Sequence, residues 1–166
     1  EALARSGARA STEDQCGALY AASQLAYFLG RFDDVQAHGG RSVAAARAIG
    51  NPARAADALL MLGYAADELK RHGAALPHFE ASIALARELG DRARLSYALN
   101  ALAGHYIETD PNRALPLFEE SLALAREAGD RDSVAVTLQN VARALVTLGR
   151  RERTSELLLE SLDIGA

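Results

Sequence analysis

A fixed sequence period constrains this chain of 166 residues more than any other feature. Serines recur at intervals of 40, 39 and 40 residues, and the stretches Ala75–Asp91 and Ala114–Asp130 are identical at 13 of 17 positions. The recurring serines are Ser42, Ser82, Ser121 and Ser161. A repeat of this length predicts stacked supersecondary units, because each unit can bury its apolar face only against a neighbour.

Each period resolves into two helices. The first helix of the second copy carries apolar or small residues at Leu59, Leu62, Gly63 and Ala66, which is the spacing of one helical face. Three copies close with a glycine followed by an N-cap residue, at Gly50–Asn51, Gly90–Asp91 and Gly129–Asp130. The apolar residues are mainly Ala and Leu, with no Trp, which suits close-packed helices. The sequence therefore predicts an all-α fold built of four helix-turn-helix repeats.

Composition argues against several classes of function. The formal net charge of −4 gives no excess of positive charge that would attract a phosphate backbone, so nucleic-acid binding is not expected. No apolar stretch reaches the 18 or so residues that span a bilayer, and no charged-then-apolar leader begins the chain. We therefore expect no membrane partner and a cytoplasmic location.

Residues that carry chemistry are scattered along the chain. The single cysteine, Cys16, excludes an internal disulfide and a cysteine-based metal cluster, and its helical setting predicts a core position. The four histidines, His38, His72, His78 and His105, share no metal-ligand spacing. The sequence also lacks a glycine-rich phosphate loop, a nucleophile elbow and a dinucleotide fingerprint. We expect no catalytic residues, no metal, no cofactor and no enzymatic activity.

The repeat resembles the tetratricopeptide repeat family, whose pattern places Leu-Gly or Leu-Ala, an aromatic, a turn glycine, and later Ala, aromatic, Ala. In the second copy these positions are Leu59, Leu62, Gly63, Ala66, Lys70, Ala75, Phe79 and Ser82. The period exceeds the family's usual length of about 34 residues, and is similar to the long form found in large bacterial regulators and regulatory ATPases. The resemblance implies a right-handed α-solenoid, an α-α superhelix. It also implies a non-enzymatic module that binds a protein or peptide segment, as the sensing or scaffolding part of a larger bacterial signalling or transcriptional regulator.

We expect five segments along the chain. They are 1–12, a remnant of a preceding repeat with its linker, followed by repeats at 13–50, 51–90, 91–129 and 130–166, the last truncated.

The resemblance also implies that the first helices of the repeats line a concave groove. The groove positions are Tyr20, Gln24, Tyr27, Tyr64, Asp67, Glu68, Tyr97, Asn100, Glu108, Gln139, Asn140 and Arg143. Tyrosines and carboxamides suit recognition of a peptide, because they offer large contact areas and hydrogen bonds at small entropic cost. The acidic excess would favour a neutral or basic segment. Two alternatives stay open: a small-molecule effector site in this groove, and tyrosines that only edge the core with their hydroxyls in water.

The last helix predicts a different kind of surface. The offset of eight residues from each serine to its closing glycine would place the fourth glycine at 169, beyond Ala166, so we expect both chain ends to be truncated. Solenoids normally finish with polar capping helices, whereas the final helix is apolar. Its self-association face comprises Leu157, Leu158, Leu159, Leu162 and Ile164. A homodimer through this uncapped helix, either functional or caused by truncation, is the third possibility.

Overall fold

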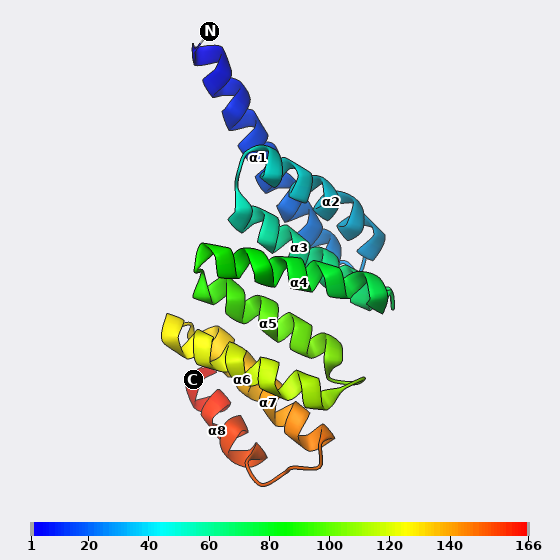
Figure 1. Cartoon of the computed structure of the whole chain (residues 1–166), viewed down its shortest axis with the longest axis vertical. Coiled ribbons are helices and arrows are strands. Elements are labelled where there is room, and N and C mark those ends of the chain that lie inside the picture. The colour runs from blue at the N-terminus through cyan, green and yellow to red at the C-terminus, as the bar shows by residue number, and fades with distance from the viewer. Residues whose placement is uncertain (1, 166) are drawn as a thin grey trace. The chain divides into compact units, whose positions relative to one another are not determined.

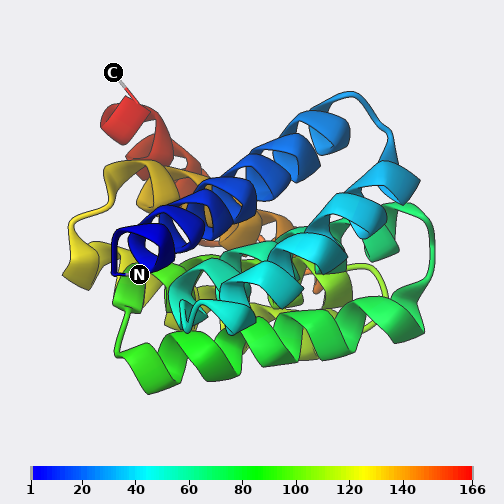
Figure 2. The same cartoon turned by 90° about the horizontal axis from the view of Figure 1, so that it is seen from above.

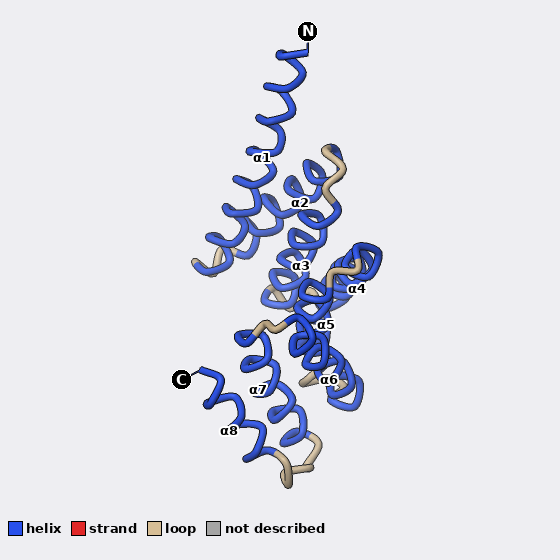
Figure 3. The backbone as a smooth tube through the Cα atoms, turned by 90° about the vertical axis from the view of Figure 1, so that its left-hand side faces the viewer, coloured by secondary structure: helices blue, strands red, loops and turns tan. Residues whose placement is uncertain are grey.

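The structure, a computed structural model, describes the backbone of residues 2–165 and the side chains of residues 12–164. The described backbone is helical throughout, with short turns and no strand (Figure 1, Figure 3). The helices are α1 (Ala2–Phe28), α2 (Phe32–Ala48), α3 (Pro52–Glu68), α4 (His72–Leu89), α5 (Arg92–Tyr106), α6 (Pro111–Ala128), α7 (Arg131–Thr147) and α8 (Thr154–Gly165). We call α1, α3, α5 and α7 the A helices and α2, α4, α6 and α8 the B helices.

The chain divides into two compact units, Glu1–Leu89 with α1 to α4 and Gly90–Ala166 with α5 to α8. In unit 1 each helix packs on the next helix along the chain, and α1 also contacts α3 (Figure 2). In unit 2 the order is the same, with α5 contacting α7. Both α3 and α7 therefore lie against the B helix that precedes them and the B helix that follows them. This is the packing that the sequence period predicts.

The helices end and begin at the predicted glycines and N-cap residues. The closing glycines Gly50, Gly90 and Gly129 have φ of 68°, 63° and 69°, a left-handed conformation that costs glycine little. The residues that follow, Asn51, Asp91 and Asp130, accept a hydrogen bond from the backbone N–H three positions on, at 3.0, 3.0 and 3.1 Å. These three N-caps satisfy amides that otherwise have no helical partner. The predicted stop and start signals are therefore confirmed.

The recurring serine has a packing role in every helix pair. Its hydroxyl donates to a backbone carbonyl on the A helix of the same pair, at 2.8 to 3.4 Å, across 25 or 26 residues of sequence. The pairs are Ser42 with Cys16, Ser82 with Ala56, Ser121 with Ser96 and Ser161 with Ala135. All four serines are buried, so a small residue with a satisfied hydroxyl lets the two helices approach closely. Cys16, whose carbonyl accepts the bond from Ser42, is buried, as its pattern predicts.

The first helix differs from its counterparts in length. α1 has 27 residues, whereas α3 has 17 and α7 has 17. It continues without a break through residues 12 and 13, where the sequence predicts the end of a linker and the start of a repeat. No helix-stop residue intervenes there, and Thr12, Glu13 and Asp14 continue the helix. The repeat boundaries themselves stay a prediction.

Candidate functional site

In unit 1 the predicted groove residues of α1 and α3 lie together; we call these six the unit 1 face. On α1 they share one stripe, where Gln24 Nε2 donates to the Tyr20 hydroxyl at 3.4 Å. The Tyr27 hydroxyl donates to Glu68 Oε1 at 3.5 Å, and its ring centroid lies 6.0 Å from that of Tyr64. The face comprises Tyr20, Gln24, Tyr27, Tyr64, Asp67 and Glu68. It therefore combines aromatic surface with two carboxylates.

Tyr27 is the centre of an aromatic group at the end of α1. Its ring packs edge-on against Phe32 at 5.7 Å, and Tyr64 packs in the same way on Phe79 at 5.7 Å. Partial burial, and then the charge of Glu68, raise the pKa of the Tyr27 phenol. The phenol is therefore neutral at physiological pH and acts as a hydrogen-bond donor.

The cation Arg54 lies beside the unit 1 face, and sequence reasoning did not predict it there. The guanidinium carbon of Arg54 lies 5.2 Å from the centroid of the Tyr20 ring, within the range of a cation–π contact. Arg54 also supplies the N–H that caps α3 through Asn51. Its place in the first turn of the helix was visible in the sequence, but the contact with α1 depends on tertiary packing.

In unit 2 three of the predicted residues of α5 and α7 form a hydrogen-bonded ladder. Asn100 Nδ2 donates to Thr137 Oγ1 at 2.7 Å, and Asn140 Nδ2 donates to Asn100 Oδ1 at 2.9 Å. Arg143 Nη2 then reaches Asn140 Oδ1 at 3.4 Å. We call Asn100, Asn140 and Arg143 the unit 2 face. The ladder orients each carboxamide and leaves the exposed guanidinium at its outer end.

Three predicted groove residues have other settings. Glu108 lies in the turn after α5, because that helix ends at Tyr106. Gln139 Nε2 donates to Ser161 Oγ at 2.9 Å and so reaches toward α8. Tyr97 is exposed and donates its hydroxyl to Asp130, the N-cap of α7, at 3.0 Å. The structure therefore does not bring these three into the Asn100 ladder.

The predicted self-association face of α8 is only partly exposed. Leu158, Leu159 and Leu162 are 42%, 61% and 68% exposed. Leu157 is buried at 7% and faces the hollow between α6, α7 and α8, whereas Ile164 is half-buried. Only the three exposed leucines are therefore available to another molecule.

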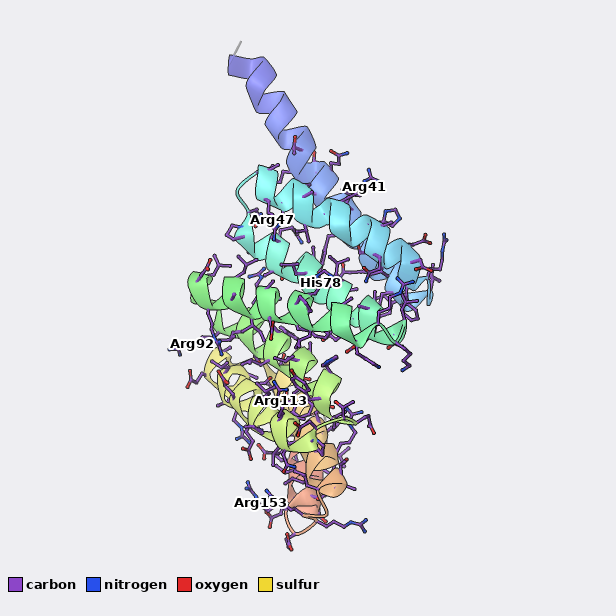
Figure 4. All side chains as sticks on the ribbon, turned by 45° about the vertical axis from the view of Figure 1, so that its right-hand side comes forward. Arg41, Arg47, His78, Arg92, Arg113 and Arg153 are labelled. Carbon is purple, nitrogen blue, oxygen red and sulfur yellow. The ribbon has the colours of Figure 1, made fainter. Side chains whose placement is uncertain are left out.

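Each unit also has a hollow away from the predicted groove residues. In unit 1 a space of about 410 Å³ lies between the α2–α3 turn and α4, with Arg47 at its edge (Figure 4). In unit 2 a space of about 290 Å³ lies between α6, α7 and α8, where Arg126 pairs with Glu160 and Arg153 lines the wall. Neither hollow is lined by a predicted groove residue, so they lend no support to an effector site in the groove.

Among the residues that the structure describes, none of the helices combines the length and the apolar character that crossing a bilayer requires.

Comparison with known proteins supports the repeat architecture. A sequence model of the tetratricopeptide repeat matches residues 54–127. The crystal structure of BtubC (BKLC) from P. vanneervenii superposes with a TM-score of 0.78 at 18% sequence identity, covering 90% of this chain and 63% of that chain. The chain therefore spans less than two thirds of the length of BtubC. No curated protein matches the sequence. The likeness to BtubC, with the helical packing of both units, confirms the α-solenoid class.

Proposed function

We propose that this chain, which belongs to the tetratricopeptide repeat family, binds a segment of another protein through the outward faces of its A helices. Tetratricopeptide repeats are protein-interaction modules, and that general role is the premise. The finer proposal is that the unit 1 face and the unit 2 face each contact an extended or helical peptide. In this proposal the module acts in the cytoplasm without catalysis, as the sensing or scaffolding part of a larger bacterial regulator.

One observation carries the proposal: a packing position of the A helices keeps one residue type in every repeat, while the position beside it differs. The packing position of the A helices is Leu in every repeat, at Leu19, Leu59, Leu99 and Leu138. The next position, which is half-buried in unit 1, reads Tyr20, Leu60, Asn100 and Gln139. A position that served only to hold the fold would be expected to keep one residue type. Divergence at this position, next to an invariant leucine, supports recognition there.

The chemistry of the two faces indicates what they bind. The unit 1 face presents aromatic rings beside Asp67 and Glu68, which suits a peptide with basic and apolar side chains. The unit 2 face presents carboxamides held in place by the Asn100 ladder, which suits a peptide backbone because each amide both donates and accepts. The rings and the orientated amides lose little entropy on binding.

A peptide library displayed on phage tests the proposal. We expect panning against the purified chain to select peptides enriched in basic and apolar residues. Tyr64→Ala should weaken binding of a peptide that contacts the unit 1 face by about tenfold or more, as truncation of a central contact does. Asn100→Ala should do the same for a peptide that contacts the unit 2 face. The control is Glu80→Ala, an exposed residue of the B helix α4, which should leave the Kd unchanged.

Two outcomes would contradict this function. Selection of no peptide would argue against a peptide ligand. Unchanged affinity in the Tyr64→Ala, Asn100→Ala double variant, with circular dichroism showing an intact fold, would place the site elsewhere. The regulatory role is tested separately by the full-length reading frame, in which an adjacent ATPase, cyclase or DNA-binding module would support it.

A further inference from the structure

The internal contact between a B helix and the following A helix shows which residues such a contact buries. In unit 1, Val43 of α2 packs on Ala58 and Leu62 of α3. The neighbouring Gly39 of α2 faces Leu62, whose Cδ2 would lie 2.8 Å from an added Cβ. Ala65, further along α3, packs with Val35 of α2. The A helix thus contributes its positions 58, 62 and 65, and the B helix contributes its positions 35, 39 and 43.

The same positions are buried where α6 meets α7 in unit 2. The period places Phe118 and Leu122 of α6 at the positions of Gly39 and Val43, and they are 0% and 7% exposed. On α7, the residues at the positions of Ala58, Leu62 and Ala65 are Thr137, Val141 and Ala144, which are all buried. Both units therefore use one pattern of contact.

Among the described helices, α1 and α8 carry this pattern on a face that no other helix of the same unit covers. On α8 the equivalent positions are Leu158 and Leu162, which are 42% and 68% exposed. On α1 they are Ala18, which is exposed, Ala22, which is half-buried, and Leu25, which is 60% exposed. These positions are buried in the internal contacts of both units, so their exposure here marks two unfilled halves of one type of contact.

The two halves also fit each other in size. In unit 1 the B helix has a small residue where the A helix has a large side chain, because Gly39 faces Leu62. On the free faces the order is reversed, because α8 offers Leu158 and Leu162 where α1 offers Ala22 and Ala18. Where α1 has a large side chain, at Leu25, α8 has the smaller Thr154. Close packing requires such alternation of large and small side chains across a contact.

We propose that α8 of one copy of this chain packs on α1 of a second copy, reproducing the internal α2–α3 contact between molecules. The interaction is head-to-tail, because the two copies contribute different faces. It uses neither the unit 1 face nor the unit 2 face, and so it goes beyond the peptide-binding function. Burial of Leu25 on α1 and of Leu158 and Leu162 on α8 provides the apolar driving force.

Two single variants and their mixture test the contact. Leu162→Glu blocks the α8 face and Leu25→Glu blocks the α1 face, and both residues are exposed, so the fold should tolerate each change. In sedimentation velocity over a concentration series, the unaltered chain should associate, and each variant should associate more weakly by more than about tenfold. A mixture of the two variants should restore association, because each variant keeps the face that the other lacks. The complex should stop at one copy of each variant.

Leu159→Glu is the matched control. Leu159 lies on the same helix and is 61% exposed, but its equivalents Glu80 and Glu119 are exposed within their units. We expect this variant to associate like the unaltered chain. A symmetric contact between two α8 helices would instead survive Leu25→Glu alone, and Leu162→Glu would remain monomeric in the mixture. That result, or a strict monomer at every concentration, overturns the proposal.

Discussion

Replacement of Gly63 by alanine is a direct test of the helix spacing in unit 1. An alanine Cβ at this position of α3 would lie 2.4 Å from Cε1 and 2.6 Å from Cδ1 of the Phe79 ring. Phe79 is fully buried, so the ring has no free space into which it can turn. The buried Ala103 and Phe118 at the equivalent positions of α5 and α6 show that a helix pair of this repeat can hold both side chains. The cost in unit 1 is therefore that of shifting α4 from α3.

The magnitude follows from two opposing effects. Overpacking a closed core typically costs about 1–3 kcal/mol, whereas Gly to Ala inside a helix gains about 1 kcal/mol from propensity. Gly104→Ala supplies the reference, because Gly104 lies within α5 and an added Cβ would meet no atom within 4 Å. Gly63 lies inside α3 and Gly104 in the last turn of α5, so the propensity gain is at least as large at Gly63. The difference in free energy of unfolding between the variants is therefore a lower limit on the cost of the clash. We expect Gly104→Ala to be more stable by about 1–3 kcal/mol.

Urea denaturation followed by circular dichroism measures this difference. Repeat arrays can unfold in more than one step, so hydrogen exchange gives local values for the same comparison, at the amides of α3 and α4 for Gly63→Ala and at the amides of α5 and α6 for Gly104→Ala. If Gly63→Ala is as stable as Gly104→Ala, the close contact between Gly63 and Phe79 does not constrain the pair. The spacing of α3 and α4 would then be set by other contacts.

Two further predictions concern hydrogen bonds that fix the helix pairs. Ser82→Ala removes the bond to the Ala56 carbonyl without leaving a large cavity, so the free energy of unfolding should fall by about 1 kcal/mol; an unchanged urea midpoint would show that the serine serves only as a small residue. Hydrogen bonds from backbone amides, first that from Ser133, lower the pKa of Asp130 below its ordinary value of 3.8. The contribution of Asp130 to the free energy of unfolding is therefore complete above pH 3.8 and is lost as the pH falls through the lower pKa of the folded state. The Asp130→Asn variant should keep most of the cap but lose this acid dependence in thermal melts, and an unaltered pH profile would argue against the assignment.

Local signals account for what the sequence predicted well. The left-handed glycines and the N-caps Asn51 and Asp91 depend on a few neighbouring residues, which a single copy of the repeat contains. The inward stripe of Leu59, Leu62 and Ala66 depends only on helical periodicity, and these residues are buried. The period of the serines predicted the stacking, but their bonds to the A helices could be identified only once the two helices of a pair were placed.

The misplaced residues all depend on where a helix ends or how it is rotated. Glu108 falls in a turn because Asp110 caps α6 and Pro111 begins it, and the third repeat has one residue fewer before the next serine. Leu157 faces inward, although its equivalents Leu117 and His78 are only half-buried. Family positions transfer the register of a helix, but they do not transfer its length or the depth to which each side chain is buried. The candidate site is therefore less predictable than the fold.

The two proposed surfaces of α1 are separable because they lie on opposite sides of one helix. Tyr20, Gln24 and Tyr27 recur at the same spacing as Ala18, Ala22 and Leu25, but the two sets are offset by two positions. With 3.6 residues per turn, two positions correspond to about 200° around the helix axis. A charge at Leu25 therefore points away from the tyrosines, so it should abolish self-association and leave peptide affinity unaltered. Loss of both in Leu25→Glu would mean that the copies must assemble before they bind a partner.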